Sequence, residues 1–188
     1  MLKISAAVIG TLFGVSVHAL YKAAANEELP LDAGQSFLSF SETQSFTYHD
    51  ALMIELTRQL HDDGGVSPVV ASKFIWNSIG SNYAHDHAAS DRWIAMVRWR
   101  NTWGAAPRGS FPVTLFGPNE YWSTAHFAGS LQSVQADIAE AIDSYSDDIT
   151  ESDAARILMA NVSAADRRLR KRAATLGVAV TADGNFSI

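Results

Sequence analysis

The side chains best suited to metal-assisted or acid–base chemistry lie in the middle of the chain. His85 and His87 are two residues apart, a spacing at which both can reach one ion from an extended segment, and Asp91 and His126 are further candidate ligands. Together with Glu120, they are also the candidates for a hydrolase. A His-x-His pair alone does not define a ligand set, so we interpret this segment as a solvated loop and predict neither a metal nor a cofactor.

The sequence lacks the motifs that accompany common catalytic sites. It has no Gly-x-Ser-x-Gly elbow, no phosphate-binding loop and no His-Glu-x-x-His helix. It also has no cysteine, which excludes disulfides, thiolate zinc sites and a cysteine nucleophile and is compatible with a reducing cytoplasm. We therefore predict a cytoplasmic binding protein with no catalytic residue.

The strongest positive patch lies near the C-terminus, although the whole chain has a net charge of −6. In one interpretation these cations contact DNA phosphates from a helix pair joined at residues 161–163, which looks like a second helix-turn-helix. In the other, Arg167, Arg170 and Lys171 pair with the acidic run at residues 143–153, on a solvated or dimer-facing helix. The patch consists of Arg167, Arg168, Arg170, Lys171 and Arg172.

The elements that would position a DNA-binding surface begin in the first 25 residues, which have two incompatible interpretations. As a secretory signal or anchor, Lys3 supplies the charged start and residues 4–17 the apolar run, with a small-residue cleavage site at 17–19. As a helix-turn-helix, residues 4–13 form a first helix, residues 14–16 a tight turn, and residues 17–25 a second helix capped by Ser16.

Length and the two glycines favour the helix-turn-helix. A membrane span needs about 20 apolar residues, whereas residues 4–20 supply 17 with His18 among them. We expect Gly10 to let the second helix cross close to the first, and Gly14 to take the positive φ that ends the first helix. The alternative is an exported or membrane-anchored interaction protein that uses residues 4–20 as its signal or anchor.

The elements that follow alternate short strands and helices. Residues 37–40 and 45–48 are strand-prone runs around a polar turn and predict a β-hairpin. Apolar positions at Leu52, Leu56 and Leu60 predict a helix over residues 50–61 that ends at two glycines. A further helix is expected from Ser67 and Pro68 to residue 80.

Residues 12–20 read Leu-Phe-Gly-Val-Ser-Val-His-Ala-Leu, Leu29 and Pro30 follow the second helix, and residues 46–50 and 60–67 lead into the next two helices. In these stretches the chain resembles the DNA-binding domain of the MerR family, with its Gly-Val-Ser turn, its aromatic-to-Asp entry into helix three and its Gly-x-Ser entry into helix four. The resemblance covers roughly the first 80 residues. It implies a winged helix-turn-helix that binds double-stranded DNA, in a sequence-specific transcriptional regulator that acts as a homodimer.

The resemblance also implies which residues meet the DNA. Family members carry an arginine and paired tyrosines just after the helix-seating leucine, where this chain has Tyr21, Lys22 and Ala23. Residues 1–80 hold four basic and eight acidic side chains, a net charge of −4, so we expect docking through few side chains and the backbone amides at the helix start. The predicted DNA-binding residues in this domain are Ser16, Val17, His18, Tyr21, Lys22 and Gln44.

The rest of the chain is expected to link, dimerise or sense. With 188 residues and 47% hydrophobic composition, the sequence most naturally forms two modest units, and we place a linker at residues 81–90 before a dimerisation or effector region at 91–188. Aromatic residues crowd positions 92–127. They are either core or the lining of a pocket for a small-molecule effector, and core is the favoured interpretation.

The secondary structure of this region is predicted from local patterns. Residues 93–99 fit a strand or a helix, and residues 111–116 fit a strand. Ser130 is predicted to cap a helix that begins at Leu131. Residues 150–153 look like a capping box that opens another helix. Ser163 is the predicted cap of a last, basic helix that ends at Gly177. The expected fold class is mainly α with a small β component, an N-terminal winged helix-turn-helix followed by an α+β or helical C-terminal region.

Overall fold

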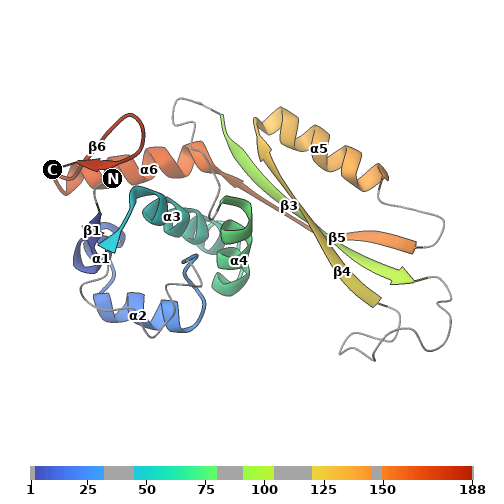
Figure 1. Cartoon of the computed structure of the whole chain (residues 1–188), viewed down its shortest axis with the longest axis horizontal. Helices are drawn as coiled ribbons and strands as arrows, with labels where there is room; N and C mark the ends of the chain where they lie inside the picture. The colour runs from blue at the N-terminus through green and yellow to red at the C-terminus, as the bar shows by residue number, and fades with distance from the viewer. Residues whose placement is uncertain (1–2, 32–44, 80–90, 104–119, 145–149, 188) are drawn as a thin grey trace. The chain divides into compact units, whose positions relative to one another are not determined.

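The computed structural model describes residues 3–31, 45–79, 91–103, 120–144 and 150–187 (Figure 1). The described residues are mainly helical with a smaller share of strand, which confirms the expected mainly α class with some β structure. The chain divides into two compact units, Met1–Arg92 with Ala160–Ile188, and Trp93–Met159. The last helix therefore belongs with the N-terminal residues, whereas the sequence analysis placed it in a separate C-terminal region.

The first unit starts with a short strand, β1 (Ile4–Ser5), and two helices, α1 (Ala6–Phe13) and α2 (Val17–Ala25). The first helix begins two residues later than predicted because Ser5 caps it, its hydroxyl accepting a hydrogen bond from the Val8 amide at 3.4 Å. Ile4 is left to pair with Phe46 of strand β2 (Ser45–Phe46) in an antiparallel ladder. The N-terminus is thus tied to the chain that enters the third helix.

The turn between α1 and α2 forms as the glycines predict. Gly14 is left-handed with φ of 67°, and the Val15 amide donates to the Gly10 carbonyl at 2.8 Å. A Cβ on Gly10 would lie 2.7 Å from the Val15 carbonyl oxygen, so only glycine fits beneath this turn. Gly10 therefore makes room for the turn itself, in addition to its predicted role in helix crossing.

The two helices are bent by 94° at this turn. Among the described helices, none by itself has the length and apolar composition to cross a membrane, although α1 and α2 would meet that test if they were counted as one segment. Residues 6–25 therefore do not form one continuous rod.

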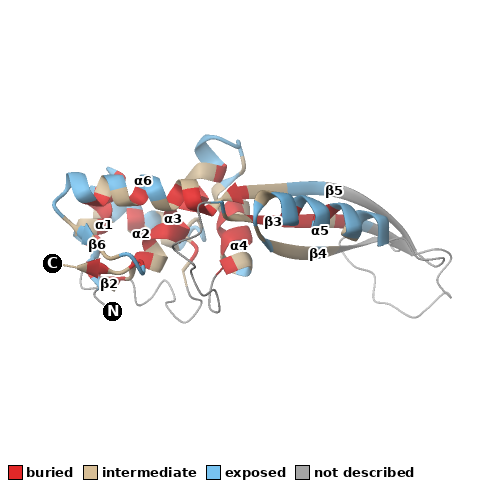
Figure 2. Cartoon of the chain, turned by 90° about the horizontal axis from the view of Figure 1, so that it is seen from above, coloured by how far each residue is buried: buried red, intermediate tan, exposed pale blue. Residues whose placement is uncertain are grey.

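Helices α3 (Tyr48–Asp62) and α4 (Pro68–Ile79) form the centre of the first unit. Thr47 and Asp50 make a reciprocal capping box at the start of α3, which explains why the helix begins before Asp50. Nearly every residue of α3 from Tyr48 to Thr57 is buried (Figure 2). Of the predicted hairpin, residues 37–40 lie outside the described residues, and Ser45–Phe46 pairs with β1.

Helix α6 (Val162–Thr175) packs against α3 and completes this unit with the short strands β6 (Ala179–Val180) and β7 (Phe186–Ser187). Its cap is Asn161, whose side chain accepts from the Ala164 amide at 2.8 Å. The prediction of Ser163 as the cap is wrong: Ser163 lies inside the helix, and its hydroxyl accepts from the Arg92 amide at 2.9 Å. Gly177 follows α6 with φ of 72°, as expected for a helix end.

The second unit is a three-stranded sheet with one helix. Strands β3 (Trp93–Trp103), β4 (Glu120–Gly129) and β5 (Thr150–Asn161) lie in the order β4-β3-β5, and helix α5 (Leu131–Ser144) packs on β3 and β4. Residues 93–99 are thus a strand. The core combines alternate residues of β3 with the buried stripe of α5, namely Ala95, Val97, Trp99, Val134 and Ile138.

The predicted helix after residues 150–153 is wrong, because these residues begin β5. A local capping pattern does not include the pairing with β3, which decides the structure here. The Ser130 cap is confirmed, since its hydroxyl accepts from the Ser133 amide at 3.1 Å. The predicted strand at residues 111–116 lies outside the described residues.

The end of α2 yields a stability prediction. Glu27 follows the helix with φ of 58°, a left-handed conformation that costs a residue with a Cβ about 1–2 kcal/mol. Its carboxylate pairs with Lys73 of α4 at 2.9 Å, but both side chains are largely exposed, so this pair contributes little. Glu27→Gly should therefore raise the free energy of unfolding by about 1 kcal/mol in urea titrations.

Glu27→Ala is the matched control, because it removes the same ion pair and keeps the Cβ. It should be no more stable than the parent. Equal gains in both variants would contradict backbone strain as the cause.

Candidate nucleic-acid interface

The start of α2 presents a helix N-terminus to solvent. Ser16 is exposed, and its hydroxyl accepts from the Ala19 amide at 3.1 Å as the cap of the helix. The first amides of a helix point outward and carry a partial positive charge, which suits a phosphate oxygen. The predicted cap is confirmed.

One face of α2 is open to solvent along its length. His18 and Lys22 are exposed and four residues apart, so they lie on the same side of α2. Together with Ser16, the exposed cap of the helix, they are here called the α2 surface. Val17 and Tyr21 are half-buried beside it, and Leu20 is buried on the opposite side. Of the residues predicted in this domain, Ser16, Val17 and His18 lie at the start of α2, Tyr21 and Lys22 lie further along the same helix, and Gln44 lies outside the described residues.

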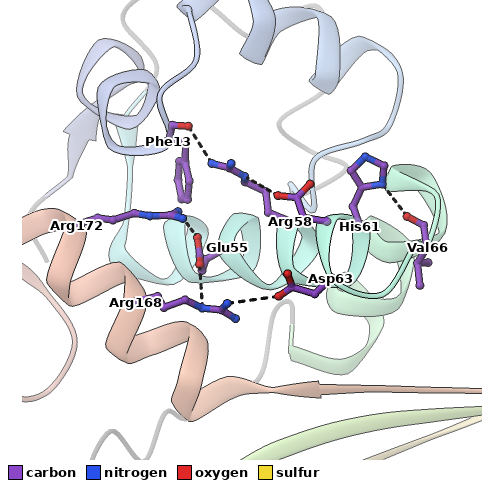
Figure 3. Close-up of polar contacts among 9 residues, drawn as sticks. Phe13, Glu55, Arg58, His61, Asp63, Val66, Arg168 and Arg172 are labelled. Atoms are coloured by element: carbon purple, nitrogen blue, oxygen red, sulfur yellow. Dashed lines mark hydrogen bonds and ion pairs between the residues drawn. The ribbon is translucent and has the colours of Figure 1, made fainter.

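The turn that positions the α2 surface is anchored from α3. Arg58 donates from Nη1 to the carbonyl oxygen of Phe13 at 2.9 Å, and its guanidinium lies 5.6 Å from the centre of the Phe13 ring (Figure 3). Phe13 is the last residue of α1, where helix carbonyls lack a partner in the helix itself. A side chain of the central helix therefore fixes the point from which the turn departs.

A buried carboxylate joins α3 to α6. Glu55 is only 3% exposed, and its two oxygens contact Nη1 of Arg172 at 2.5 Å and Nε of Arg168 at 3.4 Å (Figure 3). Burial raises the pKa of Glu55 above its ordinary value, and the nearby guanidiniums of Arg172, Arg168 and Arg58 oppose that rise. Arg168 also reaches Asp63 at 3.4 Å.

A second polar group holds the outer part of α6. Arg170 pairs with Asp166 at 2.8 Å and donates to the Thr181 carbonyl at 2.8 Å. The Tyr48 hydroxyl donates to the other oxygen of Asp166 at 2.6 Å, and burial is the largest cause that raises the pKa of Tyr48. Arg170 is therefore used to attach α6 to α3 and to the C-terminal strands.

Several of the C-terminal cations are engaged in ion pairs within the first unit. Arg168 and Arg170 pair with carboxylates of their own unit. The predicted pairing of Arg170 with the acidic run at residues 143–153 stays a prediction, because residues 145–149 lie outside the described residues. The second helix-turn-helix is wrong, because strand β5 precedes α6. Arg167 and Lys171 are exposed, but α6 lies on the other side of α3 from α2 (Figure 1).

No sequence pattern predicted the role of Glu55, the carboxylate that joins α3 to α6. Glu55 lies among apolar positions of a predicted amphipathic helix, and a charged residue on such a stripe is a signal for a buried ion pair. Its partners are more than 110 residues away, at Arg168 and Arg172. No local spacing connects them.

The metal and aromatic candidates have different outcomes. His85 and His87 lie outside the described residues, and within the described ranges there is no group of three residues suited to hold a metal ion. His126 lies on β4, where burial lowers its pKa.

Trp99 is buried in the core of the second unit, with Trp93 and Phe127 packed against that core, so these aromatics are core residues as expected.

The Glu55 pair yields a prediction on stability and pH. Arg172→Ala removes one of the two cations that contact the buried Glu55 carboxylate. It should lower the free energy of unfolding at pH 7 by about 2–3 kcal/mol. This is somewhat less than the cost of removing a fully buried partner, because Arg168 still contacts the carboxylate. The folded-state pKa of Glu55 is already raised, so the loss of Arg172 raises it further. The deficit should therefore grow as pH rises through that pKa and shrink as pH falls below it.

Urea unfolding at several pH values measures this effect, with Lys171→Ala as the exposed control on the same helix. Adding Glu55→Gln to Arg172→Ala should restore part of the loss at pH 7. A deficit that is independent of pH and is not relieved by Glu55→Gln would contradict the ion pair as its origin.

Comparison with protein-family models finds no match, and comparisons with curated proteins and with solved structures find no significant match. The function has to be argued from the side chains of this chain.

Proposed function

We propose that this chain is a cytoplasmic, sequence-specific DNA-binding transcriptional regulator, and that its N-terminal residues form a MerR-like winged helix-turn-helix. The observation that carries the proposal is the 94° bend between α1 and α2 at a turn with left-handed Gly14 and capping Ser16. This geometry seats one helix against the unit and leaves the next with an exposed N-terminal surface. A recognition helix enters the major groove of DNA in this way.

The order of elements agrees with the proposed fold. The described part of the first unit runs β1, α1, α2, β2, α3 and α4, and β1 pairs with β2. The wing would fall within residues 32–44, outside the described residues, together with the proposed contact from Gln44. In the proposed arrangement, Ser16 and the first amides of α2 bind a phosphate, while His18 and Lys22 reach base edges or the adjacent backbone.

Charge points to a dimer on the DNA. Three arginines of the first unit are engaged with groups of that unit, namely Arg58, Arg168 and Arg172. The α2 surface carries one lysine, Lys22. A DNA-binding surface with so few cations binds phosphate weakly. A two-fold dimer would place two such surfaces on the duplex and double the number of phosphate contacts. We propose that the chain acts as a homodimer on double-stranded DNA, with the second unit in dimerisation or in sensing a small-molecule effector or partner protein, and without catalysis.

The test is a fluorescence anisotropy titration of the full chain with a randomised duplex pool, first at about 50 mM salt and then at increasing salt. We expect binding that weakens with salt. Lys22→Ala should weaken binding at all sequences and reduce the slope of log affinity against log salt by about 1 for each phosphate contact that it makes.

Lys171→Ala is the matched control, because it removes an exposed lysine from α6, on the other side of α3. It should leave both affinity and slope unchanged. No binding at low salt, or equal losses in Lys22→Ala and Lys171→Ala, would contradict DNA recognition through the α2 surface.

A further inference from the structure

A groove of about 290 Å³ lies between α2 and α3 in the first unit. Its walls are mostly apolar and come from the turn, both helices and the start of α4, including Val15, Ala19, Ala23, Leu29, Ile54 and Pro68. Val15 is 38% exposed and borders this groove. The groove is a space that the described side chains surround and leave unfilled.

The polar groups around the groove are mainly hydrogen-bond acceptors. Glu28 and Asp62 contribute carboxylates, and the Asp62 side chain is 55% exposed. His61 has Nδ1 placed 2.9 Å from the Val66 carbonyl oxygen, which accepts only if Nδ1 carries the proton, so neutral His61 has Nε2 as an acceptor (Figure 3).

The one guanidinium in the lining is already engaged. Arg58 donates from Nη1 to Phe13 and has Nε 3.7 Å from Asp62. Arg58 and His61 rise from the same side of α3 (Figure 3). With two carboxylates and one arginine, the lining has a net charge of −1 when His61 is neutral.

We propose that this groove is a binding site for a small organic amine with an apolar body. The charged nitrogen would pair with a carboxylate of the lining, that of Glu28 or Asp62, and the apolar part would cover Val15, Ala19 and Ala23. A cavity of about 150 Å³ holds benzene, so a groove of this size takes about a dozen non-hydrogen atoms. Charge complementarity selects a cation, since an anion would face two carboxylates.

The site does not depend on the proposed function. Its test uses the full chain without DNA, so a failure of the amine site and a failure of DNA recognition are separate results. If both hold, an occupant that touches α2 and α3 would act on the helix that carries the α2 surface, and DNA and amine affinities would be linked.

The test is isothermal titration calorimetry with three ligands of similar size and ring system. Tryptamine carries an ammonium group, 3-ethylindole is neutral, and indole-3-acetate is an anion. We expect tryptamine to bind at least tenfold more tightly than the other two. Equal affinity for all three ligands, a preference for the anion, or no tryptamine binding at millimolar concentration would overturn the proposal.

Two kinds of variant locate the site. Glu28→Gln with Asp62→Asn should abolish the preference for the cation, and Ala23→Leu should fill the groove and abolish binding of tryptamine. Glu140→Gln, which removes a carboxylate from α5 in the other unit, is the control and should bind tryptamine as the parent does. Circular dichroism confirms that each variant is folded, and unchanged tryptamine binding in folded Glu28→Gln/Asp62→Asn would also overturn the proposal.

Discussion

The contact on which the first unit depends is the buried pair of Glu55 with Arg172. Arg172 belongs to α6 and Glu55 to α3, and the same guanidinium lies 5.9 Å from the centre of the Phe13 ring at the end of α1. Arg58 approaches that ring as well and binds the Phe13 carbonyl. One buried negative charge therefore gathers the cations that join the C-terminal helix, the central helix and the start of the turn. A carboxylate in such a place requires its partners, because its desolvation is costly without them.

This arrangement divides the basic residues of α6 between ion pairs within the unit and exposed positions. Five cations within six residues suggest a phosphate-binding patch, but alternate positions on a helix face opposite sides. Arg168 and Arg172, four residues apart, face α3 and Glu55, whereas Arg167 and Lys171 face solvent. Some of the cations of α6 hold the unit together, and the others lie on an exposed face remote from α2. DNA recognition, as proposed, then depends on the helix start and on few side chains.

The parts of the structure that the sequence predicts are those whose cause is local. Gly14 and Ser16 specify the turn and the cap within a few residues, and the apolar spacing of Leu52, Leu56 and Leu60 specifies α3. The errors have causes elsewhere in the chain. Residues 150–153 carry a helix-start pattern but pair with β3, and Asn161 replaces Ser163 as a cap because Ser163 binds the Arg92 amide. Glu55 and Arg172 are 117 residues apart, so their pairing depends on the tertiary fold.

Helix α2 both carries the α2 surface and lines the groove. Leu20 is its one buried residue. At the start, the Val15 amide binds the Gly10 carbonyl, and after the end, the Glu28 amide binds the Ala23 carbonyl while Glu27 reaches Lys73. Between these points the side of α2 that carries Ala19 and Ala23 borders open space. An occupant of that space would touch α2 itself, so under the proposed function it would also affect how the α2 surface meets DNA.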